Sequence, residues 1–296
     1  MYQSDSTRIR AIIAVIMVQI LFGINYIASK IILKDFPPPI WAAARVIVAA
    51  IALWAIAIVW KRKKPQLTIP FLAHLTLFAL LGVVINQASF LAGLRYTTAT
   101  NSAVLNTLIP VFTLFFVTLT HQEELRPKRA VGFLLSLLGV LALRKIEDFS
   151  LSNQTVVGDL LTILNCVSYA LYLTISRKFI VDYDTIWITA WLFSLGSIGL
   201  TILSIPSWHS FMMPTLHAGL IGCIVFSILG STLLAYLLNN WALAKLKSSS
   251  VALFIYLQPV VASFLAWIWF GEVLTPRTIL SSLLIFFGML LTLQKK

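Results

Sequence analysis

The stretch E-E-L-R-P at residues 123–127 recurs as E-V-L-T-P at residues 272–276, so a Glu-x-Leu-x-Pro connector is repeated 149 positions later. Apolar residues surround both copies, and three further identities keep the same offset: Ala103 with Ala252, Pro110 with Pro259, and Gly139 with Gly288. Self-similarity at a fixed offset is the signature of a duplicated unit. We therefore divide the chain into two related halves, residues 1–149 and 150–296.

Long apolar runs fill the chain on either side of the connectors. The 296 residues are 59% hydrophobic and only 11% charged, with a mean hydropathy of +0.94. Soluble chains carry roughly 25% charged residues, so this composition excludes a separate soluble domain. The runs are continuous, as in membrane-spanning helices of about 20 residues, and lack the alternation of barrel strands. Ten spans are expected, at residues 9–33, 38–60, 71–94, 97–120, 127–143, 156–179, 185–205, 216–242, 248–270 and 274–293.

Five spans in each half have a topological consequence. The second half enters the membrane from the opposite side to the first, so a pseudo-two-fold axis in the membrane plane relates the two. Of the 22 Lys and Arg residues, fifteen lie at one set of span ends and six at the other. Positive residues concentrate on the cytoplasmic side, which places both termini there. We predict an all-α membrane protein with ten transmembrane helices arranged as two inverted five-helix repeats.

Several functional classes are not expected. The net charge of +12 lies in loops, where it determines topology, so a nucleic-acid partner is not predicted. Cys166 and Cys223 have no CxxC spacing, and the four histidines lack metal-ligand spacing, so no metal or cofactor is expected. The spans contain no H-E-x-x-H motif and no pair of acids, and an enzyme is therefore not predicted.

Five stretches of the chain resemble a known family. F-G-I-N-Y-I-A-S-K at residues 22–30 resembles the W-G-x-N-F-x-x-x-K stretch in the first helix of the EamA family, of the drug/metabolite transporter superfamily, with Phe22 in place of the usual Trp. Residues 94–112, residues 168–178 and the two connectors resemble its other landmarks. The resemblance covers the whole chain. It implies a central cavity lined by helices 1, 3, 4, 6, 8 and 9, and export of amino acids or other small metabolites.

Polar side chains on those helices are the candidate site. A polar group within a span costs free energy unless it faces a cavity or a partner helix. Amides and phenols at mid-depth suit a zwitterionic or amphipathic solute, although each could instead bond a neighbouring helix, worth about 0.6 kcal/mol. We predict as substrate-binding residues Asn25, Tyr26, Gln87, Asn106, Tyr172, Tyr236 and Gln258.

Prolines and charges within the spans add further expectations. Pro110 and Pro259 each remove a backbone hydrogen bond, so we predict that they act as hinges or shape the cavity. Arg45, about seven residues into its span, is expected to snorkel to the outer interface, with gating or binding of a substrate carboxylate as the alternative. All ten acids lie in loops or near span ends, Asp159 one turn inside. Movement is therefore expected to proceed downhill or by exchange, without a buried acid relay.

These features predict a multi-pass carrier of the inner membrane that exports neutral or aromatic amino acids by alternating access. An exchanger of a nucleoside-bearing or other larger metabolite is the alternative, because the same lining would serve it. A non-transporting membrane scaffold is the alternative from another class. The expected partners are a small-molecule substrate and the lipid bilayer, and the sequence predicts no particular oligomeric state.

Overall fold

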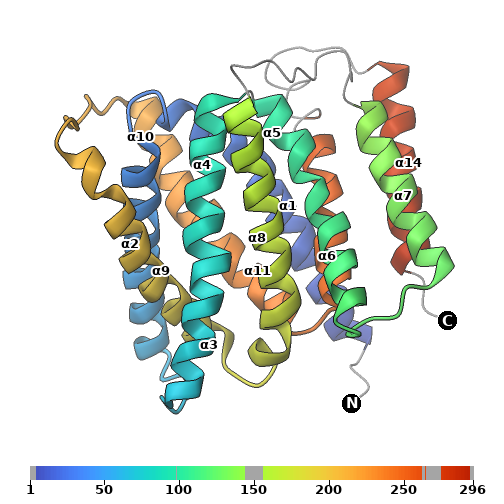
Figure 1. Cartoon of the computed structure of the whole chain (residues 1–296), viewed down its shortest axis with the longest axis horizontal. Coiled ribbons are helices and arrows are strands. Elements are labelled where there is room, and N and C mark those ends of the chain that lie inside the picture. Colours follow the sequence, from blue (N-terminus) through green and yellow to red (C-terminus); the bar gives the residue numbers. More distant parts are fainter. Residues whose placement is uncertain (1–4, 98, 144–155, 262–263, 265–274, 294–296) are drawn as a thin grey trace.

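The computed structural model describes residues 5–97, 99–143, 156–261, 264 and 275–293, and all regular elements within these residues are helices (Figure 1). The all-helical prediction is confirmed for this part of the chain. The first half contains α1 (Asp5–Ile32), α2 (Pro38–Val59), α3 (Ile69–Ala79), η1 (Leu80–Ile85), α4 (Asn86–Tyr96), α5 (Ala99–Asn106), α6 (Leu108–Leu119) and α7 (Pro127–Leu143). The second contains α8 (Val156–Ile180), α9 (Thr185–Trp208), α10 (Ala218–Val225), η3 (Phe226–Leu234), α11 (Ala235–Leu243), α12 (Ser248–Leu253), η4 (Phe254–Tyr256) and α14 (Pro276–Leu293).

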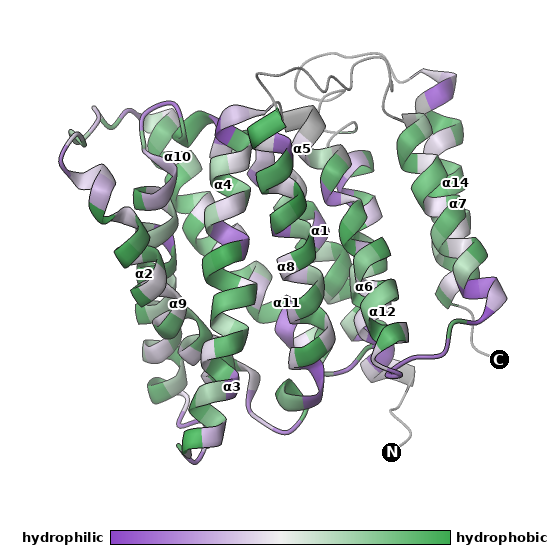
Figure 2. Ribbon diagram, viewed as in Figure 1, coloured by the Kyte–Doolittle hydropathy of each residue, from purple (hydrophilic) through white to green (hydrophobic). Residues whose placement is uncertain are grey.

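Six helical stretches among the described residues are long and apolar enough to cross a membrane. They are Ser6–Ile32, Pro38–Val59, Ile69–Tyr96, Val156–Ile180, Thr185–Trp208 and Ala218–Leu243. Shorter apolar helices, Leu108–Leu119, Ser248–Val261 and Ile279–Leu293, lie within three of the other expected spans. Expected spans 248–270 and 274–293, and the second connector with Glu272, lie partly outside the described residues. Hydrophobic residues cover the lengths of the helices, and hydrophilic residues gather at the connecting segments (Figure 2).

Side-chain caps fix where several helices begin. The Thr68 hydroxyl accepts a hydrogen bond from the Phe71 amide, at 3.3 Å, and α3 starts at Ile69, directly after Thr68. The Asp184 carboxylate accepts from the amides of Ile186 and Trp187 at the start of α9. Each cap satisfies amides that have no partner within the helix. The turns before α3 and α9 are therefore encoded locally.

Pro110 and Pro259 each follow a helix interruption. A proline cannot donate to the carbonyl four residues earlier, and its ring crowds that carbonyl. In the first half α5 ends at Asn106, four residues before Pro110, and α6 begins at Leu108. In the second half the 3-10 turn η4 contains Ile255, four residues before Pro259. The expected loss of regular helix is thus present at equivalent places in the two halves.

Two π-helical segments were not expected from the sequence. η1 interrupts the stretch that continues into α4, and η3 interrupts the stretch that continues into α11. A π turn inserts an extra residue per turn and redirects the side chains that follow it, and such turns are frequent at functional sites. Asn86 and Gln87 directly follow η1, and Tyr236 follows η3 by one residue. The π segments therefore set the direction of three polar side chains.

The two halves pack through one shared interior. α2 packs along α9, α7 along α14, α4 along α8, and α1 along α11, and each pair takes one helix from each half. Small residues bring the backbones together: a Cβ on Gly132 of α7 would lie 2.6 Å from the carbonyl oxygen of Gly288 on α14. The pair α7 and α14 forms one side of the bundle, and the first turn of α1 and the last turn of α14 lie toward the same edge (Figure 1).

Candidate functional site

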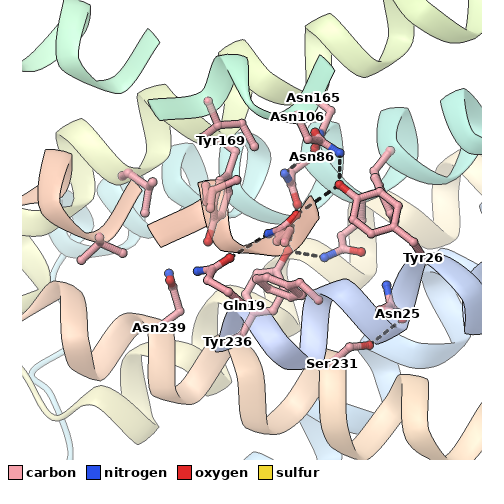
Figure 3. Close-up of a pocket in the computed structure, with 18 of the residues that line it drawn as sticks. Gln19, Asn25, Tyr26, Asn86, Asn106, Asn165, Tyr169, Ser231, Tyr236 and Asn239 are labelled. Atoms are coloured by element: carbon pink, nitrogen blue, oxygen red, sulfur yellow. Dashed lines mark hydrogen bonds between the residues drawn. The ribbon is translucent and has the colours of Figure 1, made fainter. Parts of the chain in front are cut away.

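A cavity of about 70 Å³ lies between helices of both halves. At 10–15 Å³ of accessible space per water, it holds roughly five water molecules. Six of the seven predicted site residues line it: Asn25, Tyr26, Gln87, Asn106, Tyr236 and Gln258. Other polar residues of the lining were not among the predicted site residues: Gln19, Arg45, Asn86, Asn165, Tyr169, Ser231 and Asn239. Figure 3 shows amides and phenols from several helices pointing toward a common centre.

A chain of hydrogen bonds runs through this lining. Each residue donates to the next in the order Gln87, Tyr236, Asn86, Asn165, Asn106, Tyr26, Gln258, Gln19. Donor–acceptor distances in five of these steps lie between 2.6 and 3.2 Å. Each phenol has a single hydrogen to donate, so the direction of the chain also fixes which atom of each amide faces its neighbour. We call this set the amide–phenol chain.

Aromatic rings hold the two phenols of the chain in place. Phe22 packs edge-on against Tyr236, with ring centroids 6.1 Å apart, and Phe90 packs edge-on against Tyr26 at 5.5 Å. Edge-to-face contacts of this kind favour one ring orientation. Phe22 and Phe90 also line the cavity. The site therefore combines fixed polar groups with an apolar aromatic wall.

Two predicted residues lie outside the amide–phenol chain. The Asn25 side-chain oxygen accepts from the hydroxyls of Ser231, at 2.7 Å, and Ser227, at 3.3 Å, and Asn25 lines the cavity. Tyr172 is not part of the lining: its hydroxyl donates to the side-chain oxygen of Asn240, at 2.6 Å, and its ring lies against Gly82. Tyr169, one turn earlier on α8, faces the cavity instead.

Arg45 does not reach the membrane interface, so the expectation that it snorkels there is wrong. It is only 2% exposed and lines the cavity. Its neighbours one turn away on α2, Ala42 and Ala49, are buried, whereas Ile47 and Ile58 on a different face of the helix are exposed. A snorkelling side chain must lie on the lipid-facing side of its helix. The exposed isoleucines of the folded bundle show which face of α2 meets lipid, and Arg45 lies on the other face.

Three buried atoms of the lining have no hydrogen-bond partner. They are Nε of Arg45, Oε1 of Gln87 and Nδ2 of Asn239. A buried polar atom without a partner costs about 1–3 kcal/mol, so such atoms call for an explanation. The cavity thus presents two free donors and one free acceptor.

Polar clusters lie at the two ends of the helices around the cavity. At one end, Lys30 Nζ donates to the carbonyl oxygens of Leu94, at 2.6 Å, and Thr97, at 3.0 Å. The Thr97 hydroxyl donates to Asp159 Oδ1 at 2.7 Å, and Asp159 is 2% exposed. At the other end, Glu123 of the first connector accepts from Arg129 Nη2, at 2.8 Å, and from the hydroxyl and amide of Ser249. The first connector is therefore tied to the start of α12, in the other half.

Comparisons with known proteins agree with this architecture. Residues 9–144 and 156–294 each match the model of the EamA-like transporter family. The chain is 28% identical over 284 residues to an uncharacterized transporter of Archaeoglobus fulgidus, covering 95% of this chain and 96% of that protein. It is 23% identical over 287 residues to the uncharacterized transporter YoaV of Bacillus subtilis, covering 95% of each. A WAT1-related protein of Arabidopsis thaliana is 23% identical over 328 residues, covering 98% of this chain and 83% of that protein.

A solved crystal structure shares the fold. It matches with a TM-score of 0.77 at 14% identity, covering 98% of this chain and 97% of that one. Identity at this level supports the fold alone. The family matches, in contrast, span both halves, and the described helices include six of membrane-crossing length. The chain is therefore a multi-pass membrane transporter, and it belongs to the EamA-like transporter family.

Proposed function

We propose that this transporter exports neutral or aromatic amino acids by alternating access. The observation that carries the proposal is the cavity between the two halves, lined by amides, phenols and phenyl rings. Small amphipathic solutes bind in this way, with apolar contacts to rings and orientation by a few polar groups. At about 70 Å³ the cavity has room for only a few waters, so we expect helices of the lining to move when a solute as large as an amino acid binds.

Contacts between equivalent residues support two inverted five-helix repeats. A residue can touch its own repeat counterpart only close to the axis that relates the repeats. Gln87 bonds Tyr236, and the Ser136 hydroxyl donates to the Ile285 carbonyl oxygen at 3.2 Å, both at the 149-residue offset seen in the sequence. The axis of the proposed symmetry thus passes between α4 and α11 and between α7 and α14. On this proposal, residues 1–149 and 150–296 rock against each other about the cavity.

The proline interruptions are well placed for such movement. The break at Asn106 and Thr107 lies directly beside a residue of the amide–phenol chain, and η4 precedes Gln258 of the same chain. We assign Pro110 and Pro259 the role of hinges that let the ends of these helices move while the middle keeps contact with the solute. The positions of Lys and Arg support the cytoplasm as the location of both termini, and we propose the inner membrane as the location of the protein.

The test is counterflow into proteoliposomes that contain the purified full-length protein. Vesicles preloaded with unlabelled amino acids should accumulate labelled phenylalanine or leucine, and Asn106→Leu should abolish this uptake. Phe287→Leu, on an exposed part of α14, is the matched control and should transport normally. Uptake of nucleosides in place of amino acids would establish the larger-metabolite exchanger. Absence of uptake for both solute classes would leave the scaffold role and refute the proposal.

A further inference from the structure

We infer that Arg45 binds the carboxylate of the transported solute, with Asn239 as a second donor and Gln87 as the acceptor for its ammonium group. The inference rests on the proposed function and deepens it, because it defines the solute as one with a free carboxylate. An uncharged nucleoside has no anionic group to neutralise a guanidinium. The charge of the cavity therefore favours a solute with a carboxylate over an uncharged nucleoside.

Arg45 differs from the other described arginines in being buried without a protein partner, since Arg10 and Arg95, which also lack one, are exposed. Arg8, Arg177 and Arg277 each donate to a main-chain carbonyl oxygen, at 2.6–2.8 Å. The ion pairs among the described residues join other side chains: Arg62 with Asp184, Arg126 with Glu124, and Arg129 with Glu123. Arg45 forms neither kind of contact within the described residues, and its buried Nε is unpartnered. Its charge is thus available to a group that enters the cavity.

An unpaired guanidinium in a membrane interior requires compensation. The guanidinium remains charged in proteins, and a buried charge without a counterion is strongly unfavourable. Ionisable residues within spans therefore mark substrate pathways. The other residues that line the cavity are uncharged, so the site carries one positive charge. A single carboxylate matches this charge, and a phosphate group would call for more cations.

The residues that carry the three unpartnered atoms line the cavity together with Tyr236. The Tyr236 hydroxyl accepts from Gln87. Asn239 lies three residues further along α11, so it shares a face of that helix with Tyr236. Tyr236 and Asn239 both point toward the cavity in Figure 3. Two donors and one acceptor in one neighbourhood complement the carboxylate and the ammonium of an α-amino acid.

The aromatic wall completes the proposed binding mode. Phe22 lies edge-on against Tyr236, and both line the cavity. A solute whose carboxylate reaches Arg45 would place its side chain along these rings. An aromatic or large aliphatic side chain buries the most apolar surface there. The site therefore favours neutral, apolar amino acids over acidic ones, whose second carboxylate would have no cation among the lining residues.

The experiment compares binding of phenylalanine, its amide and its deaminated acid to the full-length protein in nanodiscs, by calorimetry. The wild type should bind the amide about 10- to 100-fold more weakly than phenylalanine, as expected for loss of one charge-assisted hydrogen bond. Arg45→Gln should remove this preference, and Arg45→Lys should retain part of it. Arg126→Gln, at an exposed ion pair, is the matched control and should keep the full preference.

The outcomes separate this inference from the proposed function. If the wild type binds the amide as tightly as phenylalanine, or Arg45→Gln keeps the preference, the assignment of Arg45 is wrong while amino-acid transport stands. If Arg45→Gln weakens phenylalanine and its amide equally, Arg45 supports the cavity as a whole and the inference also fails. If only the deaminated acid binds and is transported, the carboxylate assignment stands and the proposed amino-acid cargo is wrong. Thermal unfolding of Arg45→Gln should match or exceed that of the wild type, because no protein partner is lost.

Discussion

Asn165 holds the middle of the amide–phenol chain. It accepts from Asn86 at 2.6 Å and donates to Asn106 at 2.7 Å, so it joins α4 and α5 through α8. Its removal takes one hydrogen bond from each of two buried partners at once. In such a chain the loss of one member costs more than one ordinary bond, because the remaining groups stay buried. The site therefore depends on residues that do not themselves have to touch the solute.

Asn165→Leu should destabilise the protein and weaken solute binding together. The loss of one hydrogen bond at each of two buried amides, at about 1–3 kcal/mol each, predicts a clear drop in the thermal midpoint. Fluorescence-monitored unfolding of the purified protein measures it, and calorimetry measures binding. Asn165→Asp would retain the acceptor and should lose less binding than Asn165→Leu. Equal losses for the two variants would contradict the role of the chain.

Tyr172→Phe tests whether a residue outside the cavity lining contributes to solute binding. The variant loses one hydrogen bond to Asn240, outside the lining, and should lose about 1 kcal/mol of stability. Its solute affinity should stay that of the wild type. Tyr26→Phe, which removes a member of the amide–phenol chain, is the comparison and should bind the solute more weakly. Loss of solute affinity in Tyr172→Phe would show that Tyr172 contributes to the binding site, as the sequence predicts.

Most of the lining was accessible to sequence reasoning, and the exceptions have physical reasons. Mid-depth amides and phenols could be recognised because each costs free energy in lipid. Tyr172 was misleading because Tyr169 and Tyr172 lie one turn apart, and the local direction of α8 decides which one reaches the cavity. Arg45 required knowledge of which face of α2 meets lipid, and the exposed residues of the folded bundle supply it.

At the scale of elements, close helix contacts depend on single glycines. A Cβ on Gly132 would clash with the Thr292 hydroxyl and lie 2.6 Å from the Gly288 carbonyl oxygen, whereas nothing lies within 4 Å of the same atom on Gly222. Gly132→Ala should therefore separate α7 from α14 and cost about 1–3 kcal/mol. Gly222→Ala should be neutral or slightly stabilising. Thermal unfolding of the two variants compares them directly, and equal midpoints would contradict the tight α7–α14 contact.

Helix interruptions were predictable in part. Pro110 and Pro259 predict a break in their helices because proline cannot form the backbone hydrogen bond to the carbonyl four residues earlier. The π segments η1 and η3 have no equivalent residue signal, since a π turn needs no special residue and depends on what the widened turn packs against. Gly82, within η1, lies against the Tyr172 ring, a contact between the two halves that no local pattern reveals. Local chemistry thus predicted the breaks, and tertiary packing determined the π turns.

At the scale of the whole molecule, no described acid faces the cavity. Asp159 is buried, but its hydrogen bond goes to Thr97 at the end of α4, away from the lining. A proton relay needs a titratable group that the solute or water can reach. We therefore expect counterflow to continue when a protonophore collapses the proton gradient, and Asp159→Asn to keep it. Uptake that stops with the gradient, despite a solute gradient, would contradict this expectation.

The positions of the chain ends test the proposed symmetry as a whole. An even number of spans returns the chain to the face where it began, and two inverted five-span repeats require this. The described ends of α1 and α14 lie toward the same edge of the bundle (Figure 1). Reporter fusions at the two termini, one active only in the cytoplasm and one only outside it, should both report the cytoplasm. Single cysteines near Lys61 and Arg126 should share this side, and one near Lys34 should be labelled from the opposite side. Termini on opposite faces would leave an odd number of spans, and no pair of equal repeats could then enclose the cavity.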